Sequence, residues 1–223
     1  MLITKKSEYS IRYKCWINII ISFIEKYSLP YDKVLDIGCH DGTFKDMLGK
    51  CLNQPVIGID PNKSVINSKK DIYYGYCHKI PFNDATFDLL TLISVFEHIN
   101  PELHEDSLKE MNRVLKSNAL LFVQMPNPRF PIELHTRLPL LGFLPRSVQI
   151  EYAYLFGKRP QKELSFWSIG LERVIKYAKK HNFRILGVNK YVYPKEVIPK
   201  SVQKLYFILR FFPMGSYGVF QKK

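Results

Sequence analysis

The chain has 223 residues, which is enough for one globular domain with a sizeable core. Hydrophobic residues make up 46% of it and charged residues 24%, a composition that excludes disordered and fibrous classes. The net charge of +13 comes mainly from the last third: residues 1–150 hold 18 basic and 16 acidic residues, whereas residues 151–223 hold 15 and 4.

The first residues carry charge and tyrosine where a signal peptide has an apolar stretch. No apolar run approaches the ~20 residues that cross a membrane. The four cysteines are isolated, with no CxxC pair and no metal-ligand spacing nearby. We therefore expect a cytoplasmic protein with reduced thiols and no metal site.

Apolar residues at helical spacing predict an amphipathic helix over residues 8–28. Short apolar runs then alternate with helical segments, a pattern that predicts a parallel sheet covered on both faces. We expect strands over residues 33–37, 55–60, 72–75, 87–94 and 119–125, and helices over residues 41–50, 61–69 and 101–115.

The alternation stops at residue 126, and residues 126–167 are rich in proline and aromatic residues. A connection of this length is usually functional, so we expect a substrate lid there. Ser168 can cap a following helix that runs to about His181. A strand over residues 183–193, a helix over residues 201–212 and a last strand over residues 217–221 complete the prediction.

The strongest local signal is the segment VLDIGCHDGTF, residues 34–44, between the first strand and the next helix. In a doubly wound sheet this point borders the ligand crevice at the carboxyl ends of the strands. A dinucleotide-binding loop needs three glycines, but His40 and Thr43 occupy two of the three positions. Gly38 and Gly42 still allow the tight turn that a cofactor without phosphates requires.

Asp60 ends the second predicted strand, where a carboxylate can accept hydrogen bonds from both hydroxyls of a ribose. This position alone does not separate a nicotinamide cofactor from S-adenosylmethionine (SAM). The segments VLDIGCHDGTF, VIGID, KIPFNDATFDLLTLISVFEHI and LKEMNRVLKSNALLFVQMPNP together closely resemble the successive motifs of class I SAM-dependent methyltransferases of the type 11-like group. The resemblance covers residues 31–128. The segment PNPRFPIELHTRLPLLGFLP also looks like members linked to glycan or lipid biosynthesis.

The resemblance implies an α/β fold: a doubly wound, mostly parallel, seven-stranded Rossmann-like sheet with helices on both faces and a lid insertion after strand five. We expect one domain over residues 1–223. Its parts are an N-terminal helix (1–30), a cofactor-binding core (31–125), a substrate lid (126–167) and the C-terminal part of the sheet with basic helices (168–223).

The family also implies roles for single residues, with SAM as the cofactor. Asp36 would orient the cofactor's ammonium, and Asp60 would hold the ribose. Two positions depart from the family pattern: His40 replaces a glycine, and Tyr76 stands where many members have an acid. The expected cofactor-binding residues are Asp36, Gly38, His40, Gly42, Asp60, Pro61, Cys77, His78, Ser94 and Val95.

A sulfonium is already a strong methyl donor, so the enzyme would mainly align the acceptor and exclude water. A hydroxyl acceptor would gain from a base, and the candidates are His135 with Glu133, and His98. We expect O-methylation of a small molecule, a glycan or a lipid-linked intermediate. A non-catalytic binding module of the same fold remains an alternative.

The basic final third leaves further alternatives open. Only this positive charge favours an RNA methyltransferase, so nucleic acid is not the expected partner. The segment SVQKLYFILRFF, flanked by lysines, has the basic and aromatic composition of an interfacial helix. It fits either ordinary packing or peripheral contact with an anionic membrane at the inner face.

Overall fold

The computed structural model describes residues 5–133, 136–158, 167–193, 195 and 200–223. Seven strands form one sheet: β1 (Val34–Ile37), β2 (Val56–Asp60), β3 (Ile72–Tyr74), β4 (Phe87–Ile93), β5 (Leu115–Pro126), β6 (Phe183–Tyr191) and β7 (Gly215–Lys222). Their order is β3-β2-β1-β4-β5-β7-β6. Strands β1 to β5 are parallel, and β7 runs antiparallel to both of its neighbours. The predicted seven-stranded, mostly parallel sheet is confirmed.

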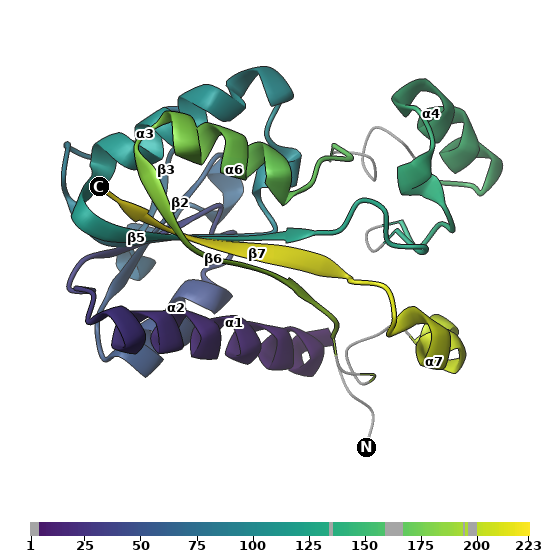
Figure 1. The fold of residues 1–223 in the computed structure, drawn as a ribbon, viewed down its shortest axis with the longest axis horizontal. Helices are drawn as coiled ribbons and strands as arrows, with labels where there is room; N and C mark the ends of the chain where they lie inside the picture. The colour runs from purple at the N-terminus through teal and green to yellow at the C-terminus, as the bar shows by residue number, and fades with distance from the viewer. Residues whose placement is uncertain (1–4, 134–135, 159–166, 194, 196–199) are drawn as a thin grey trace.

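The α-helices among the described residues are α1 (Lys5–Tyr27), α2 (Thr43–Leu52), α3 (His104–Val114), α4 (Arg146–Leu155), α6 (Leu171–Lys180) and α7 (Tyr206–Leu209). Figure 1 shows α1 and α2 on one face of the sheet and α3 and α6 on the other. Two buried apolar clusters fill these layers. One contains Trp16 and Leu48 beneath the sheet, and the other contains Leu108 and Val174 above it. The structure therefore has the predicted three-layer, doubly wound architecture.

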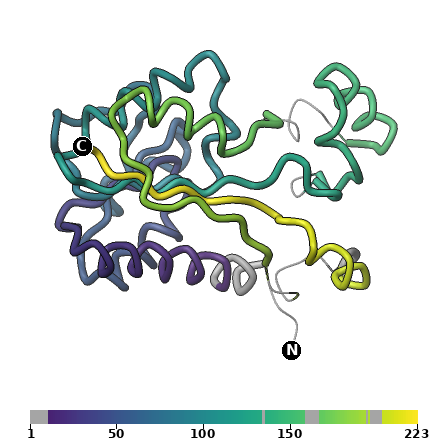
Figure 2. Tube along the Cα trace, in the orientation of Figure 1, coloured from purple at the N-terminus to yellow at the C-terminus, as the bar shows by residue number. Residues whose placement is uncertain are grey.

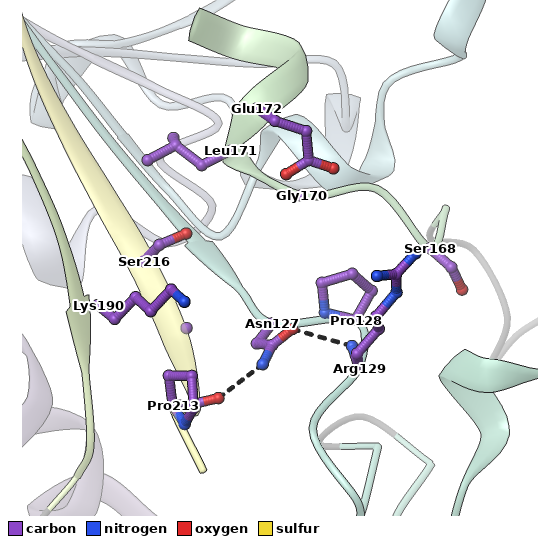
Figure 3. A pocket seen from close by; sticks show the side chains of 11 residues that line it. Asn127, Pro128, Arg129, Ser168, Gly170, Leu171, Glu172, Lys190, Pro213 and Ser216 are labelled. Atoms are coloured by element: carbon purple, nitrogen blue, oxygen red, sulfur yellow. Dashed lines mark hydrogen bonds between the residues drawn. The ribbon is translucent and has the colours of Figure 1, made fainter.

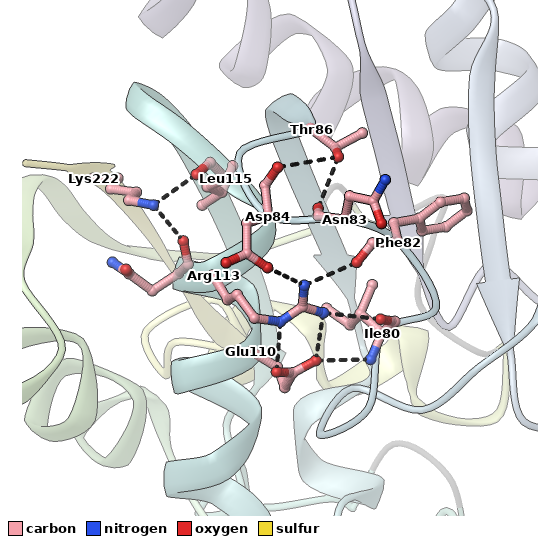
Figure 4. A network of polar contacts seen from close by, with 10 residues as sticks. Ile80, Phe82, Asn83, Asp84, Thr86, Glu110, Arg113, Leu115 and Lys222 are labelled. Atoms are coloured by element: carbon pink, nitrogen blue, oxygen red, sulfur yellow. Dashed lines mark hydrogen bonds and ion pairs between the residues drawn. The ribbon is translucent and has the colours of Figure 1, made fainter.

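An ion-pair network closes the end of the sheet where β4 and β5 begin (Figure 4). The Arg113 guanidinium donates to the carboxylates of Glu110 and Asp84 and to the carbonyls of Ile80 and Phe82, with nitrogen-to-oxygen distances of 2.7–3.0 Å. Because one side chain fixes both α3 and the loop before β4, this end of the sheet is rigid. The ligand crevice lies at the opposite end.

Three local predictions were wrong: the helix over residues 61–69, the capping of the next helix by Ser168, and the single helix over residues 201–212. Residues 61–69 form no α-helix but two 3-10 turns, η1 (Lys63–Val65) and η2 (Ser68–Lys70), because Asn62 and Asn67 each cap a short turn through the side chain. Ser168 does not cap α6: the N-cap is Gly170, and the Ser168 hydroxyl instead accepts a hydrogen bond from Gln149 at 2.9 Å.

Residues 201–212 do not form one regular helix either. They form the 3-10 helix η7 (Lys200–Leu205) followed by one α-turn, α7, which ends at Leu209. Residues 126–158 contain structure that the sequence did not predict, namely η5 (Leu141–Phe143) and α4. These segments and α7 extend from the same end of the molecule, the end at which β5 finishes (Figures 1 and 2).

Two further 3-10 helices in the described part of the chain, η3 (Phe96–His98) and η4 (Pro101–Leu103), connect β4 to α3. Within the residues described, no helix is both long enough and apolar enough to cross a membrane.

Candidate active site

A cavity of about 840 Å³ opens at the carboxyl ends of β1, β2 and β4; we call it the strand-end cavity. This volume lies within the ~300–1,000 Å³ of typical small-molecule sites. The parallel strands bring together residues that are far apart in the sequence. The lining residues are Tyr13, Asp36, Gly38, Cys39, His40, Asp41, Thr43, Phe44, Asp60, Pro61, Ile93, Ser94, Val95 and His98.

The loop after β1 is fixed against β2 by main-chain hydrogen bonds. The N–H groups of Gly38 and Cys39 both donate to the Ile59 carbonyl, at 2.8 and 3.1 Å. Gly38 has φ +72°, and a Cβ there would lie 2.5 Å from a Val95 methyl carbon. Glycine is therefore required by both backbone conformation and space. The loop brings the backbone close to the cavity.

Asp60 has a carboxylate that is already partly bound by the backbone. It accepts from the His40 N–H at 2.9 Å on one oxygen and from the Asn62 N–H at 2.8 Å on the other. Each oxygen keeps a second lone pair, and the residue is 7% exposed within the cavity wall. This orientation allows both oxygens to accept hydrogen bonds from a ligand with two neighbouring hydroxyls.

Asp36 is a fully enclosed carboxylate at the floor of the cavity. It accepts a hydrogen bond from the Thr91 hydroxyl at 2.7 Å. Burial raises the pKa of Asp36 to about 7, although the Thr91 hydrogen bond and the positive charge of Lys45 oppose this effect. A cationic ligand group beside Asp36 would favour the ionised form. The site is thus suited to a ligand carrying an ammonium.

The chain after β4 also lines the cavity. Ser94 adopts a left-handed conformation with φ +55°, and its hydroxyl donates to the Gln124 side chain at 2.9 Å. His98 follows on η3 and presents an imidazole to the cavity. Cys39 also lines the cavity, but burial raises the pKa of its thiol to about 12, so it is no nucleophile at neutral pH.

Most of the predicted site residues meet in this cavity. Gly42 is not itself among the lining residues, but it lies between two of them, Asp41 and Thr43. The predicted residues that line the cavity are Asp36, Gly38, His40, Asp60, Pro61, Ser94, Val95 and His98.

Three predicted residues lie elsewhere. Cys77 is buried in the apolar core, and the His78 ring packs against Tyr76 with centroids 5.2 Å apart; neither lines the cavity. Glu133 is a buried turn residue whose carboxylate accepts from the N–H of Thr136 at 2.6 Å and from its hydroxyl at 2.8 Å. His135 lies outside the described residues.

Sequence reasoning missed the aromatic wall of the cavity. The rings of Tyr13, from α1, and Phe44, from α2, meet edge to face with centroids 5.3 Å apart. Tyr13 lies on a helix that precedes the sheet, and only the docking of α1 brings it to the strand ends. Phe44 directly follows the glycine-containing loop, which was the available signal.

Comparison with known proteins identifies the domain. Residues 35–123 match the family described as "Methyltransferase domain". These residues, less than half of the chain, are therefore similar to that family. The match runs from β1 into β5, so the residues of the strand-end cavity lie within the matched segment except Tyr13.

Similar proteins extend this finding to the fold of the whole chain. A solved protein of Pyrococcus horikoshii shares 20% identity, covers 99% of this chain and 93% of its own, and has a TM-score of 0.62. A solved SAM-dependent methyltransferase of Archaeoglobus fulgidus has 15% identity and a TM-score of 0.57, with 92% and 94% of the two chains covered. An uncharacterized protein of Methanocaldococcus jannaschii is 36% identical over 96 residues, 42% of this chain and 40% of the relative. The aligned regions make up less than half of each curated relative.

Proposed function

We propose that the chain transfers a methyl group from SAM to an oxygen of a small molecule, a glycan or a lipid-linked intermediate. The observation that carries the proposal is the pair of carboxylates, Asp36 and Asp60, at the ends of adjacent strands in one cavity. SAM has an ammonium and a ribose diol, the two groups that these carboxylates suit. Bound there, SAM would supply an activated methyl group on a sulfonium.

The residues around the cavity would each do part of the binding. Asp60 would accept hydrogen bonds from the ribose hydroxyls, because both of its oxygens are held in place by backbone N–H groups. Asp36 would pair with the ammonium. Gly38, without a Cβ, lets the backbone approach the ligand. Phe44 and Tyr13 would exclude water from the reacting atoms.

His98 would take up the proton of a hydroxyl acceptor. His98 lies on η3, after β4, and lines the same cavity as Asp60. An imidazole accepts protons near neutral pH, whereas the neutral thiol of Cys39 does not. We expect His98→Gln to reduce the turnover of a hydroxyl acceptor by about 10²-fold or more while SAM affinity stays unchanged.

Calorimetric titration with SAM and with S-adenosylhomocysteine tests the cofactor. We expect saturable binding by the wild type and its loss in Asp60→Ala, with NADH as a ligand that does not bind. Asp41→Ala is the matched control, because it removes an exposed carboxylate of the same cavity whose partner is the Thr43 N–H. If the folded protein binds neither adenosyl ligand, the enzyme proposal fails and a non-catalytic module takes its place.

We further propose that α7 and the residues after it contact an anionic membrane surface. Leu209 is buried and the Tyr206 hydroxyl donates to the Tyr193 carbonyl at 3.0 Å, which fixes the orientation of this turn. The apolar residues Phe207, Ile208, Phe211 and Phe212 consequently face outward with exposed fractions of 63%, 47%, 74% and 44%. Exposed Lys204 and Arg210 stand among them. Aromatic residues beside cations suit an anionic lipid interface.

Vesicle sedimentation tests this contact. We expect the protein to pellet with phosphatidylglycerol-containing vesicles, and Phe211→Ser to weaken this binding, because the side chain would no longer enter the interface. Val188→Ser is the matched control, since Val188 is an exposed apolar residue on β6. Equal binding by both variants would refute the role of α7.

A further inference from the structure

A second cavity, of about 570 Å³, lies beyond the end of β5, and we call it the strand-five cavity. Figure 3 shows side chains from four separate segments pointing into it: the chain after β5, the start of α6, the end of β6 and the start of β7. The lining residues that carry functional groups are Asn127, Arg129, Ser168, Glu172, Lys190 and Ser216.

The rim of the strand-five cavity is held by hydrogen bonds to Asn127. Its side-chain amide donates to the Pro213 carbonyl at 2.7 Å, and its carbonyl oxygen accepts from the Arg129 N–H at 3.0 Å. Its own N–H donates to the Met214 carbonyl at 2.9 Å. These contacts join the chain after β5 to the chain before β7, so the cavity wall has a defined shape.

Three charged side chains line this cavity and are not neutralised by the described residues around them. Within the part of the chain that the structure describes, Arg129, Lys190 and Glu172 form no ion pair. The Glu172 carboxylate folds back over Gly170, where a Cβ would collide with it. Arg129 and Lys190 come from different strand ends and line the cavity from two sides, with Asn127 and Pro128 between them in Figure 3. The cavity thus offers two cations and one carboxylate to a ligand.

The two cavities share supporting structure. Ser94, which lines the strand-end cavity, donates its N–H to the carbonyl of Gln124 on β5 at 3.1 Å. Asn127 lies three residues further along the same chain, roughly 10 Å away at the rise of an extended strand. In addition, the Trp167 N–H donates to the carbonyl of Glu97 at 2.7 Å, beside His98. The two cavities thus lie at the ends of neighbouring strands, β4 and β5.

We infer that the strand-five cavity binds a phosphate group of the methyl acceptor, between Arg129 and Lys190. This inference rests on the proposed methyl transfer and adds the chemical class of the acceptor. Phosphate oxygens accept hydrogen bonds from a guanidinium and an ammonium, and the long, exposed side chains of Arg129 and Lys190 can turn toward one such group from two sides. Glu172 would accept hydrogen bonds from hydroxyl groups next to the phosphate, as in a sugar phosphate or a phosphorylated glycerol.

Two probes distinguish a soluble from a lipid source of the phosphate. Amide shifts of the ¹⁵N-labelled protein would be followed during titration with glycerol 1-phosphate and with dihexanoyl phosphatidic acid below its micelle concentration. We expect saturable shifts within residues 127–129, 168–172 and 213–216, and no shifts with glycerol. Tighter binding of the phosphatidic acid assigns a lipid source, and equal binding assigns a soluble phosphate.

Charge variants test the assigned residues. Arg129→Gln combined with Lys190→Gln should weaken glycerol 1-phosphate binding about tenfold or more, because two charge-assisted hydrogen bonds are lost. Glu172→Gln should strengthen the binding of inorganic phosphate several-fold, since one repelling charge is removed and this probe has no neighbouring hydroxyl groups for Glu172 to hold. The matched control combines Lys109→Gln with Lys179→Gln, two exposed lysines on α3 and α6.

SAM titration of the same variants separates this inference from the proposed function. If the double variant and its control bind phosphate equally, the attraction is only net charge and the inference is wrong. The inference is also wrong if no phosphate probe binds to a protein that still binds SAM. If the wild-type protein does not bind SAM, the methyl-transfer proposal itself is refuted.

Discussion

Replacement of Asp36 by Asn is expected to stabilise the fold at pH 8 and to impair the site. Folding raises the pKa of this carboxyl from 3.8 to about 7, chiefly through burial. Between these values the unfolded chain is ionised while the folded chain keeps the proton, so stability falls as pH rises. At 1.36 kcal/mol for each pKa unit, the buried charge costs about 4 kcal/mol above pH 7. Asn cannot ionise, and its side-chain oxygen can still accept from Thr91.

Urea unfolding at pH 4, 6 and 8, followed by the fluorescence of buried Trp16, measures this effect. The variant and the wild type should differ little at pH 4. At pH 8 Asp36→Asn should be more stable by up to about 4 kcal/mol. The same variant should bind SAM at least tenfold more weakly, because the ammonium loses its counter-ion. If its stability follows the same pH curve as the wild type, the reasoning about Asp36 is refuted.

Four further outcomes are expected. SAM affinity of the wild type should rise between pH 6 and 8, because Asp36 must lose its proton to pair with the ammonium; titrations at several pH values measure this. His40→Gly should stabilise the fold by about 1 kcal/mol, since His40 has φ +48° and glycine keeps the N–H that donates to Asp60. Gly38→Ala should cost about 2 kcal/mol or more through strain and collision with Val95, measured by thermal unfolding. Arg113→Met should cost about 2 kcal/mol or more, because the loop before β4 loses its hydrogen bonds.

The sheet and its glycine-containing loop could be predicted because their signals are local. Buried parallel strands are short apolar runs, and the carboxylates of Asp36 and Asp60 stand in or at the end of such runs. Once the strands are parallel, their carboxyl ends must meet. The position of Asp60 beside the His40 N–H follows from that arrangement.

The parts that could not be predicted depend on long-range packing. Tyr13 faces the cavity only because α1 docks beneath the sheet, which its own helical pattern does not indicate. Glu133 has the chemistry of a base, but the structure uses its carboxylate to bind Thr136 within a turn. Helix α4 gave no clear signal because several of its apolar residues, including Leu155 at 82%, are exposed, so no single apolar stripe marks it.

The antiparallel strand β7 has a consequence for how this chain folds during synthesis. β6 pairs only with β7 in the sheet order, although the ribosome makes β6 first. β7 in turn pairs with β5, for example Leu120 with Gln221, across about a hundred residues. Strand β6 therefore stays unpaired until β7 has been synthesised. In the nascent chain, strands β1 to β5 can form their part of the sheet, and the edge of β5 is unpaired. Such late, non-local pairing slows folding, and the unpaired edge of β5 is exposed to association with other chains until β7 pairs with it.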